Sequence, residues 1–332
     1  MTMRHRGKVL VLGGDNRAFL AVVRSLGRQD IEVHAGWSPR PLSALRSRYL
    51  SRVHELPAYG EDQAWLAGLT DLMDREQFDL VIPCDDPSVL LLQLHRREME
   101  PHGRCYLLPE RAFEVAFDKA STHELARSLD IPVPAQVTVE PGGEAAETLG
   151  RLHFPVVVKA PVSCSPENLY YRQRARTART PEQAARAIGQ SPVSGPLLVQ
   201  EHFPGRGMGV EVLVHEGRPL MAFQHERIHE PIRGGGSTYR RSVPLSPSLM
   251  EAVEQLVGAL DYSGVLMAEF RVQPRTGWWV LLELNARFWG SLPLAVAAGA
   301  DFPFCLYEML VEGRRDFESG YKTGLYCRNV KK

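Results

Sequence analysis

Val265-Leu-Met-Ala-Glu-Phe-Arg-Val272 and Trp278-Trp-Val-Leu-Leu-Glu-Leu284 are two apolar stretches separated by a short polar segment, and they decide the fold of this chain. Apolar runs on either side of a segment that contains proline and glycine predict an antiparallel β-hairpin. A three-residue loop over residues 275–277 would place Gly277 at the position that needs a positive φ. We therefore expect a hairpin that turns around Thr276.

Three polar side chains share one face of this expected hairpin. A loop centred on Thr276 sets Glu269 directly opposite Glu283, and because side chains alternate along a strand, Asn285 joins the same face. A two-residue loop would shift the register by one residue and separate the carboxylates. Two carboxylates and an amide oxygen form a set of hard oxygen ligands that suits Mg²⁺ bridging the phosphates of a nucleotide. Arg287 can reach an anion beside the metal.

The alternative is a hairpin whose polar face is solvated, in which two opposed glutamates would be mildly destabilising. The apolar neighbours of the two glutamates argue against full solvation. These neighbours are Met267, Phe270, Leu282 and Leu284.

Glu269, followed by Glu283-Leu-Asn285-Ala-Arg287 and a helix of small residues, resembles the metal-binding end of the ATP-grasp superfamily. The motif is most similar to the carbamoyl-phosphate-synthase-like and carboxylate–amine ligase branch, and the resemblance extends over residues 110–312. It implies an α/β and α+β chain, in which an ATP-grasp fold follows a small Rossmann-like domain with a parallel sheet. It also implies that ATP is bound with two Mg²⁺ ions, which Mn²⁺ could replace.

The composition limits the classes of partner. The chain has 332 residues with 44% hydrophobic content, enough for two or three globular domains. Lys+Arg and Asp+Glu both number 39, so no net charge attracts nucleic acid or an anionic membrane. Five cysteines without paired spacing do not suggest a disulfide framework, and we expect a reduced, cytoplasmic compartment. No apolar run is long enough for a signal peptide or a membrane span.

The first domain is expected over residues 1–110. Strands at 8–12, 31–35, 53–56 and 79–83 alternate with helices, which favours a small parallel sheet with helices on both faces. Gly13-Gly14 lacks the full dinucleotide-binding pattern, so a nicotinamide site is not expected. Asp85 follows a strand at the end where ligands of such sheets collect, so it is a candidate substrate contact. A helix N-cap is the equal alternative for Asp85.

The resemblance implies three nucleotide contacts. Lys119, at a helix start, and Lys159, which ends the apolar strand Phe154-Pro-Val-Val-Val-Lys159, would hold the phosphates. Glu201, at the end of Leu197-Leu-Val-Gln-Glu201, would lie beside the adenine. These residues fall in linker helices with a small lobe at 111–195 and in a large lobe at 196–332.

Two features depart from the family pattern. No glycine marks the phosphate loop after Lys159, where Val162-Ser-Cys-Ser-Pro166 stands. Gly207-Met-Gly209 occupies the place of the usual ribose-binding acid. Glu211 could substitute for that acid, or it could lie on the polar face of its strand. Arg233, before three glycines, is a candidate substrate contact in a loop that can close over a substrate.

These motifs predict an ATP- and Mg²⁺-dependent ligase that joins a small-molecule carboxylate to an amine. The resemblance implies attack of the carboxylate on the γ-phosphate, an acyl phosphate, and stabilisation of the developing charge by Arg287. Three alternatives stay open: a kinase on the same fold, a non-catalytic nucleotide-binding regulator, and an oxidoreductase that rests only on Gly13-Gly14. A homo-oligomer is compatible with the sequence.

Overall fold

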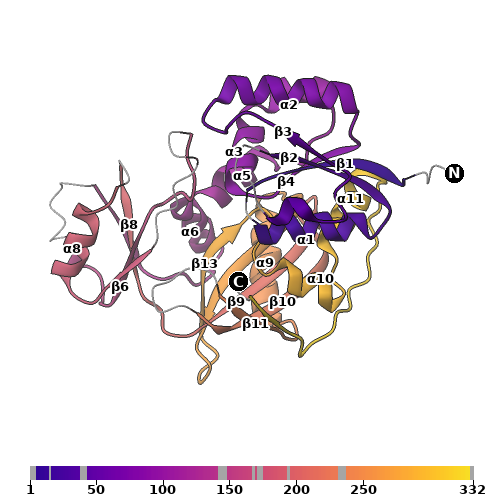
Figure 1. Cartoon of the computed structure of the whole chain (residues 1–332). Helices are drawn as coiled ribbons and strands as arrows, with labels where there is room; N and C mark the ends of the chain where they lie inside the picture. Colours follow the sequence, from indigo (N-terminus) through magenta and orange to yellow (C-terminus); the bar gives the residue numbers. More distant parts are fainter. Residues whose placement is uncertain are drawn as a thin grey trace.

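The computed structural model describes residues 5–14, 16–37, 43–140, 148–166, 169, 175–192, 195–230 and 237–329. The described residues contain three β-sheets (Figure 1). One is a parallel sheet near the N-terminus, and the other two are antiparallel sheets of four and six strands. The expected combination of an α/β part with an α+β part is therefore confirmed.

The first sheet has helices on both faces, as expected. Its order is β3-β2-β1-β4, and every pair is parallel. Along β1, Val9 and Val11 join the core that includes α1, whereas Leu10 and Leu12 join the core under α2. Both faces of β1 are thus buried, which explains its continuous apolar run. The elements are β1 (Gly7–Leu12), α1 (Asn16–Gly27), β2 (Ile31–Trp37), β3 (Arg52–Glu55), α2 (Asp62–Glu76), β4 (Leu80–Pro83), α3 (Asp86–Leu94) and α4 (Arg96–Met99).

Two linker helices lead into a small antiparallel sheet of order β5-β8-β6-β7. β8 hydrogen-bonds within this small sheet, so the change of sheet comes after Glu201 and not at residue 195. The elements are α5 (Glu110–Phe117), α6 (Lys119–Ser128), β5 (Gln136–Val139), β6 (Val156–Lys159), β7 (Arg176–Ala178), α8 (Pro181–Gly189) and β8 (Leu197–Glu201).

The six-stranded sheet carries the predicted hairpin at one edge, in the order β13-β12-β9-β10-β11-β14. Helix α9 contributes buried Leu249, Val253 and Leu256 to the core beside β9 and β10. Among the described residues no single helix is long and apolar enough to cross a membrane, although α10 and α11, bent by 84° at their junction, pass that test as a pair. The elements are β9 (Arg206–His215), β10 (Arg218–His229), β11 (Tyr239–Ser242), α9 (Pro247–Ala259), β12 (Gly264–Val272), β13 (Trp279–Asn285), α10 (Leu292–Ala298), α11 (Phe302–Val311) and β14 (Tyr326–Arg328).

The hairpin of β12 and β13 has the expected pairing but a different loop. Glu269 lies opposite Glu283, and Gly277 has a φ of 75°, as predicted. The three-residue loop was wrong: the Gln273 amide donates to the Trp278 carbonyl at 2.7 Å, so residues 274–277 form a four-residue loop. The register shifts between Glu269 and Phe270, where Leu282 is the extra residue of a β-bulge. The bulge compensates for the longer loop and restores the opposition of the two glutamates.

Candidate active site

A small pocket opens beside β13, where the linker helices and the first domain meet the large sheet. It is lined by the end of β13 together with groups from three other segments. Large-sheet residues are therefore brought next to the first domain and to the segment after β6. The lining residues are Asp86, Ala116, Phe117, Lys119, Ser163, Glu283, Leu284, Asn285 and Ala286.

The two glutamates among the predicted metal ligands lie opposite each other, but their carboxyl groups differ in electrostatic environment. Burial raises the pKa of Glu269, and the Arg227 guanidinium opposes this rise. Burial would also raise the pKa of Glu283, but the ammonium groups of Lys119 and Lys159 hold it below its ordinary value. Asn285 donates from Nδ2 to Glu283 Oε1 at 3.3 Å. Glu283 is thus held as a carboxylate with its cations already in place.

The two predicted phosphate lysines converge on this carboxylate from different elements. Lys119 is the first residue of α6, and its Nζ lies 3.1 Å from Ser163 Oγ. Lys159 ends β6 and donates to Gln200 Oε1 at 2.9 Å. Burial and the charge of Lys119 lower the pKa of Lys159 to about 8, although Glu283 acts in the opposite direction. A buried ammonium of this kind is ready for an anionic partner such as a phosphate.

His123 of α6 positions the hairpin, and no sequence pattern had indicated this role. Its ring lies fully buried, and Nε2 donates to the carbonyl of the bulge residue Leu282 at 3.0 Å. Burial lowers the pKa of His123 to about 4, so the ring is neutral near pH 7. The bulge thus provides a carbonyl by which the linker helix holds the strand that carries Glu283.

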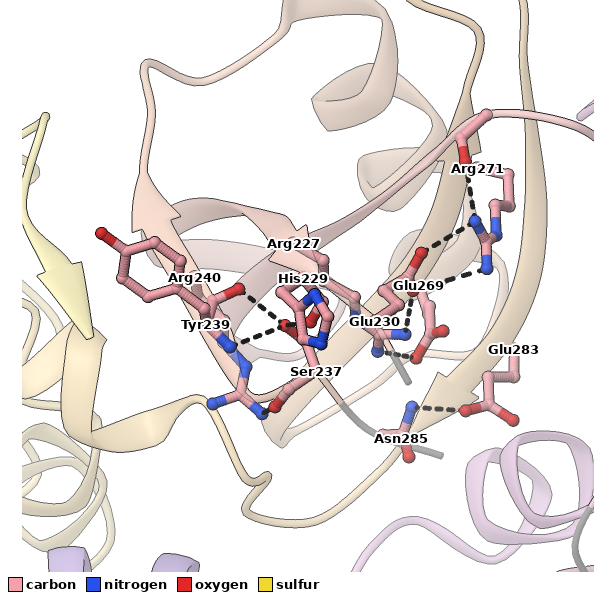
Figure 2. A network of polar contacts seen from close by, with 11 residues as sticks. Arg227, His229, Glu230, Ser237, Tyr239, Arg240, Glu269, Arg271, Glu283 and Asn285 are labelled. Carbon is pink, nitrogen blue, oxygen red and sulfur yellow. Dashed lines mark hydrogen bonds and ion pairs between the residues drawn. The ribbon is translucent and has the colours of Figure 1, made fainter. Parts of the chain in front are cut away.

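Arg227 of β10 is a second residue that sequence reasoning missed. Its guanidinium contacts the Glu269 carboxylate and lies 3.3 Å from Glu230 Oε1 (Figure 2). The side chain can cross β9 because Gly207 lies beneath it: a Cβ there would come within 2.6 Å of Arg227 Cδ. Gly207 and Gly209 are the residues found in place of a ribose acid. The sequence feature that could have indicated this contact is Gly207, which leaves room for the side chain of Arg227 on the neighbouring strand.

Arg287, the predicted catalytic residue, joins the large lobe to the first domain. Its Nε lies 2.5 Å from Asp86 Oδ1, and its Nη2 lies 3.2 Å from Asp86 Oδ2. Both side chains are largely buried, so the guanidinium plane has a defined orientation. The first residue of α3 thus positions an arginine that follows β13.

Asp85, the neighbour of Asp86, is the N-cap of α3. Its carboxylate accepts from the Ser88 amide at 3.0 Å, from Ser88 Oγ at 2.6 Å and from the Gly14 amide. The N-cap interpretation is confirmed, and these bonds engage both carboxylate oxygens. A substrate role for Asp85 stays a prediction.

Three further candidates complete the predicted set. The Glu201 carboxylate accepts from the His153 amide at 2.7 Å, at the end of the small sheet where adenine was expected. Glu211 is fully buried on the sheet face that carries Glu269, and it accepts from Ser291 Oγ at 2.7 Å. Arg233 lies outside the described residues.

The donor set can be compared with the needs of Mg²⁺. The described part of the chain contains no group of three or more His, Cys, Asp or Glu side chains that could hold a metal alone. Glu269, Glu283 and Asn285 nevertheless fit a hard cation whose remaining ligands are phosphate oxygens. The contact of Arg227 with Glu269 shows that this carboxylate already takes a cationic partner. The residues therefore fit Mg²⁺ that arrives with a nucleotide.

Comparisons with known proteins give a family match and a curated relative. A family model described as "ATP-grasp in the biosynthetic pathway with Ter operon" matches residues 194–332. The D-aspartate ligase of Enterococcus faecium is 23% identical over 304 residues, which cover 84% of this chain and 70% of that protein.

Two solved structures show that the fold is shared. The L-amino acid ligase from Bacillus licheniformis has a TM-score of 0.72 at 15% identity, and the match covers 93% of this chain and 75% of that one. The second is the biotin carboxylase domain of the Hydrogenobacter thermophilus 2-oxoglutarate carboxylase, in complex with MgADP, ADP and bicarbonate. Its TM-score is 0.70 at 17% identity, over 97% of this chain and 74% of that one.

Proposed function

We propose that this chain, which is similar to ATP-grasp proteins in its C-terminal family match and in its fold, is an ATP- and Mg²⁺-dependent ligase that activates a carboxylate as an acyl phosphate and joins it to an amine. The relatives named as ligases of D-aspartate and of L-amino acids support small-molecule acids and amines as the substrate classes. The acyl phosphate, the number of metal ions and the identity of the substrates are the finer elements of the proposal.

One observation carries the proposal. Two opposed and partly buried carboxylates, Glu269 and Glu283, lie at the end of a site that also collects Lys119, Lys159 and Arg287. A nucleotide with a chain of phosphates and its metal is the kind of ligand that needs both charges at once. A solvated polar face would not place two partly buried lysines beside one of the carboxylates.

The residues divide the work of binding and catalysis. Lys159 and Lys119 would neutralise the inner phosphates, and Glu201 would border the adenine at the end of β8. Glu269, Glu283 and Asn285 would hold Mg²⁺, which supplies positive charge at the β- and γ-phosphates when it is bound. Because the Mg²⁺ held by these residues would lie at the outer phosphates, attack of a nucleophile would be favoured at the γ-phosphorus.

The chemistry then takes two displacements. A carboxylate oxygen of the acid attacks the γ-phosphorus, the bond to the β–γ bridging oxygen breaks, and ADP leaves. The amine nitrogen attacks the acyl carbon, the carbon–oxygen bond to phosphate breaks, and an amide, phosphate and a proton result. Arg287, oriented by Asp86, would stabilise the transferring phosphoryl group and the tetrahedral intermediate.

Product analysis tests the proposal. The purified protein is incubated with ATP, Mg²⁺ and pools of small acids, with hydroxylamine as the amine. We expect ADP and phosphate in equal amounts together with an acyl hydroxamate, and neither without an acid. AMP and pyrophosphate would contradict the acyl phosphate, and a stable phosphorylated product without a hydroxamate would establish the kinase instead.

A further inference from the structure

Arg227 of β10 binds a carboxylate that was predicted to hold a metal ion. Its guanidinium contacts Glu269 Oε2 and lies 3.3 Å from Glu230 Oε1 (Figure 2). The side chains of Arg227 and Glu269 are both largely buried, so salt screens their attraction only weakly. Glu269 therefore has a cationic partner on one of the two oxygens that it could offer to Mg²⁺.

The opposed carboxylate has cations beside it as well. Burial would raise the pKa of Glu283, but the ammonium groups of Lys119 and Lys159 hold it below its ordinary value. Arg227 and the two lysines thus accompany the two opposed carboxylates. A divalent ion that arrived alone would add two positive charges to this set, and like-charge repulsion opposes that. The site therefore disfavours Mg²⁺ alone, although its oxygen ligands suit the ion.

Neighbouring groups allow Arg227 to leave Glu269 without losing every partner. Glu230 is shared between Arg227 and Arg271, whose Nη1 lies 2.9 Å from Glu230 Oε2. The buried Nε of Arg227 has no hydrogen-bond partner among the residues that the structure describes. A guanidinium that moved away from Glu269 would thus keep Glu230 and would still have a donor for a phosphate oxygen.

The contact of Arg227 with Glu269 depends on the space above Gly207 of β9. A Cβ at this position would lie 2.6 Å from Arg227 Cδ and 2.8 Å from Glu230 Oε1. The arginine side chain therefore crosses β9 because residue 207 has no side chain. Any larger residue there would displace the guanidinium while its charge stayed in the protein. Position 207 thus separates the effect of the contact from the effect of the charge.

We propose that Arg227 holds Glu269 in place of a metal ion in the nucleotide-free protein, so that the site admits Mg²⁺ only together with a nucleotide. The phosphates of a nucleotide bring the negative charge that offsets Lys119 and Lys159, and Arg227 then exchanges Glu269 for Glu230 and a phosphate oxygen. This inference rests on the proposed ligase function and concerns the regulation of its metal site. Its consequence is an order of binding in which metal and nucleotide enter as one complex.

Binding of Mn²⁺ tests the exchange, because the electron paramagnetic resonance of this ion reports how much of it is free. The ion is titrated with the protein alone, and the Mn²⁺–ADP complex is titrated separately. We expect the native protein to bind Mn²⁺–ADP, and to bind Mn²⁺ alone about tenfold or more weakly than Arg227→Met does. The gain should vanish when Glu283→Ala is added to Arg227→Met, which would locate the ion at the opposed glutamates.

Two further variants attribute the effect to the contact. Gly207→Ala keeps the charge of Arg227 but displaces its side chain, so it should gain affinity for Mn²⁺ alone as Arg227→Met does. Arg271→Met removes the same charge and is the matched control. Arg271 contacts Glu230 and the Gly205 carbonyl rather than Glu269, so the affinity for Mn²⁺ alone should stay native. Should Arg227→Met fail to fold, Gly207→Ala decides.

Equal affinity of the native protein and Gly207→Ala for Mn²⁺ alone would overturn the inference, as would a gain in Arg271→Met as large as that in Arg227→Met. Failure of the ligase proposal looks different. In that case no acid would yield a hydroxamate, although Gly207→Ala would still bind Mn²⁺ alone more tightly than the native protein does.

Discussion

Glu269 and Glu283 are partly buried and directly opposed, yet their pKa values are displaced in opposite directions because different cations lie beside them. Glu283 has the ammonium groups of Lys119 and Lys159, which favour its ionised form. Glu269 has the guanidinium of Arg227, which only partly offsets burial. At the scale of single residues, the site therefore pairs each carboxylate with a cation before any nucleotide arrives, and its chemistry depends on these local pairings.

Glu283→Ala should lower ATP turnover by about a hundredfold or more while the protein stays folded. The carboxylate lies on a polar face, so its removal spares the hydrophobic core and loses one ligand of the bridging metal. Turnover and circular dichroism are the measurements, with Glu251→Ala on the exposed side of α9 as the control. A Glu283→Ala protein that is as active as the control would refute the metal assignment.

Lys159→Met should weaken MgADP binding, and it should abolish the fall in MgADP affinity that the native protein shows at alkaline pH. The Lys159 pKa of about 8 in the free protein must rise when phosphate binds, because the charged form is then preferred. Below pH ~7 the ammonium is present in both states, and this group causes no pH dependence. Above pH ~8 binding must take up a proton, so affinity should fall by up to about tenfold per pH unit.

Calorimetry with MgADP from about pH 6.5 to about pH 9.5 measures this dependence. The methionine variant keeps the apolar stem and should give a weaker affinity that is flat over the same range. If the native protein and the variant share one pH profile, Lys159 does not contact the phosphates.

At the scale of secondary structure, the predicted pairing of Glu269 with Glu283 is confirmed, whereas the predicted three-residue loop is wrong. The four-residue loop shifts the register by one position, and the bulge at Leu282 shifts it back. The same bulge offers its carbonyl to His123 of the linker helix. Gly277 and Gly207 serve different needs: Gly277 provides a positive φ in the loop, and Gly207 provides room for Arg227.

Gly277→Ala and Gly207→Ala should separate these two roles. Gly277 has no atom within 4 Å of an added Cβ, so alanine there should cost about 1 kcal/mol from its left-handed backbone alone. At Gly207 the Cβ would displace Arg227 from Glu269, which we expect to cost about 3 kcal/mol. Mg²⁺ should recover part of this loss, because it neutralises the two carboxylates that have lost the charge of Arg227.

Urea unfolding in EDTA and in Mg²⁺ measures both effects. Gly277→Ala should lose the same free energy of unfolding in the two conditions. Equal losses for Gly207→Ala in EDTA and in Mg²⁺ would show that Arg227 does not neutralise the metal ligands.

Local sequence patterns predicted the site residues whose positions depend on strand periodicity or on the burial of a charge. Alternation along two strands placed Glu269 and Glu283 together, and the lysine at the end of an apolar strand was identified because burial of its charge demands a partner. Arg227 and His123 were not predicted, because each reaches the site through a tertiary contact that leaves no periodic pattern in the sequence. The bulge was not predicted either. The longer loop and the extra residue shift the strand register in opposite directions, so the pairing of Glu269 with Glu283 is unchanged.

At the scale of the whole molecule, the site is assembled where three parts of the chain meet. The large sheet supplies the two glutamates, the linker and small lobe supply the lysines, and the first domain supplies Asp86. The ion pair of Asp86 with Arg287 joins the first domain to the proposed reaction centre. A defect in the first domain should therefore affect catalysis more than nucleotide binding.

Asp86→Asn tests this coupling. The amide keeps the shape but loses the charge that orients Arg287, so hydroxamate formation should fall about tenfold while MgADP affinity is unchanged. Asp71→Asn, on the exposed side of α2, is the control and should match the native protein. A loss of MgADP affinity in step with activity would place Arg287 and Asp86 in the nucleotide site instead.

Activation of the acid at the γ-phosphate is the central step of the proposed reaction, and the fate of the carboxylate oxygen tests it most directly. An acid labelled with ¹⁸O in both carboxylate oxygens is converted with ATP, Mg²⁺ and an amine, and the phosphorus products are analysed by ³¹P NMR. We predict one ¹⁸O atom in inorganic phosphate and none in the nucleotide. Label in AMP, with release of pyrophosphate, would contradict activation at the γ-phosphate.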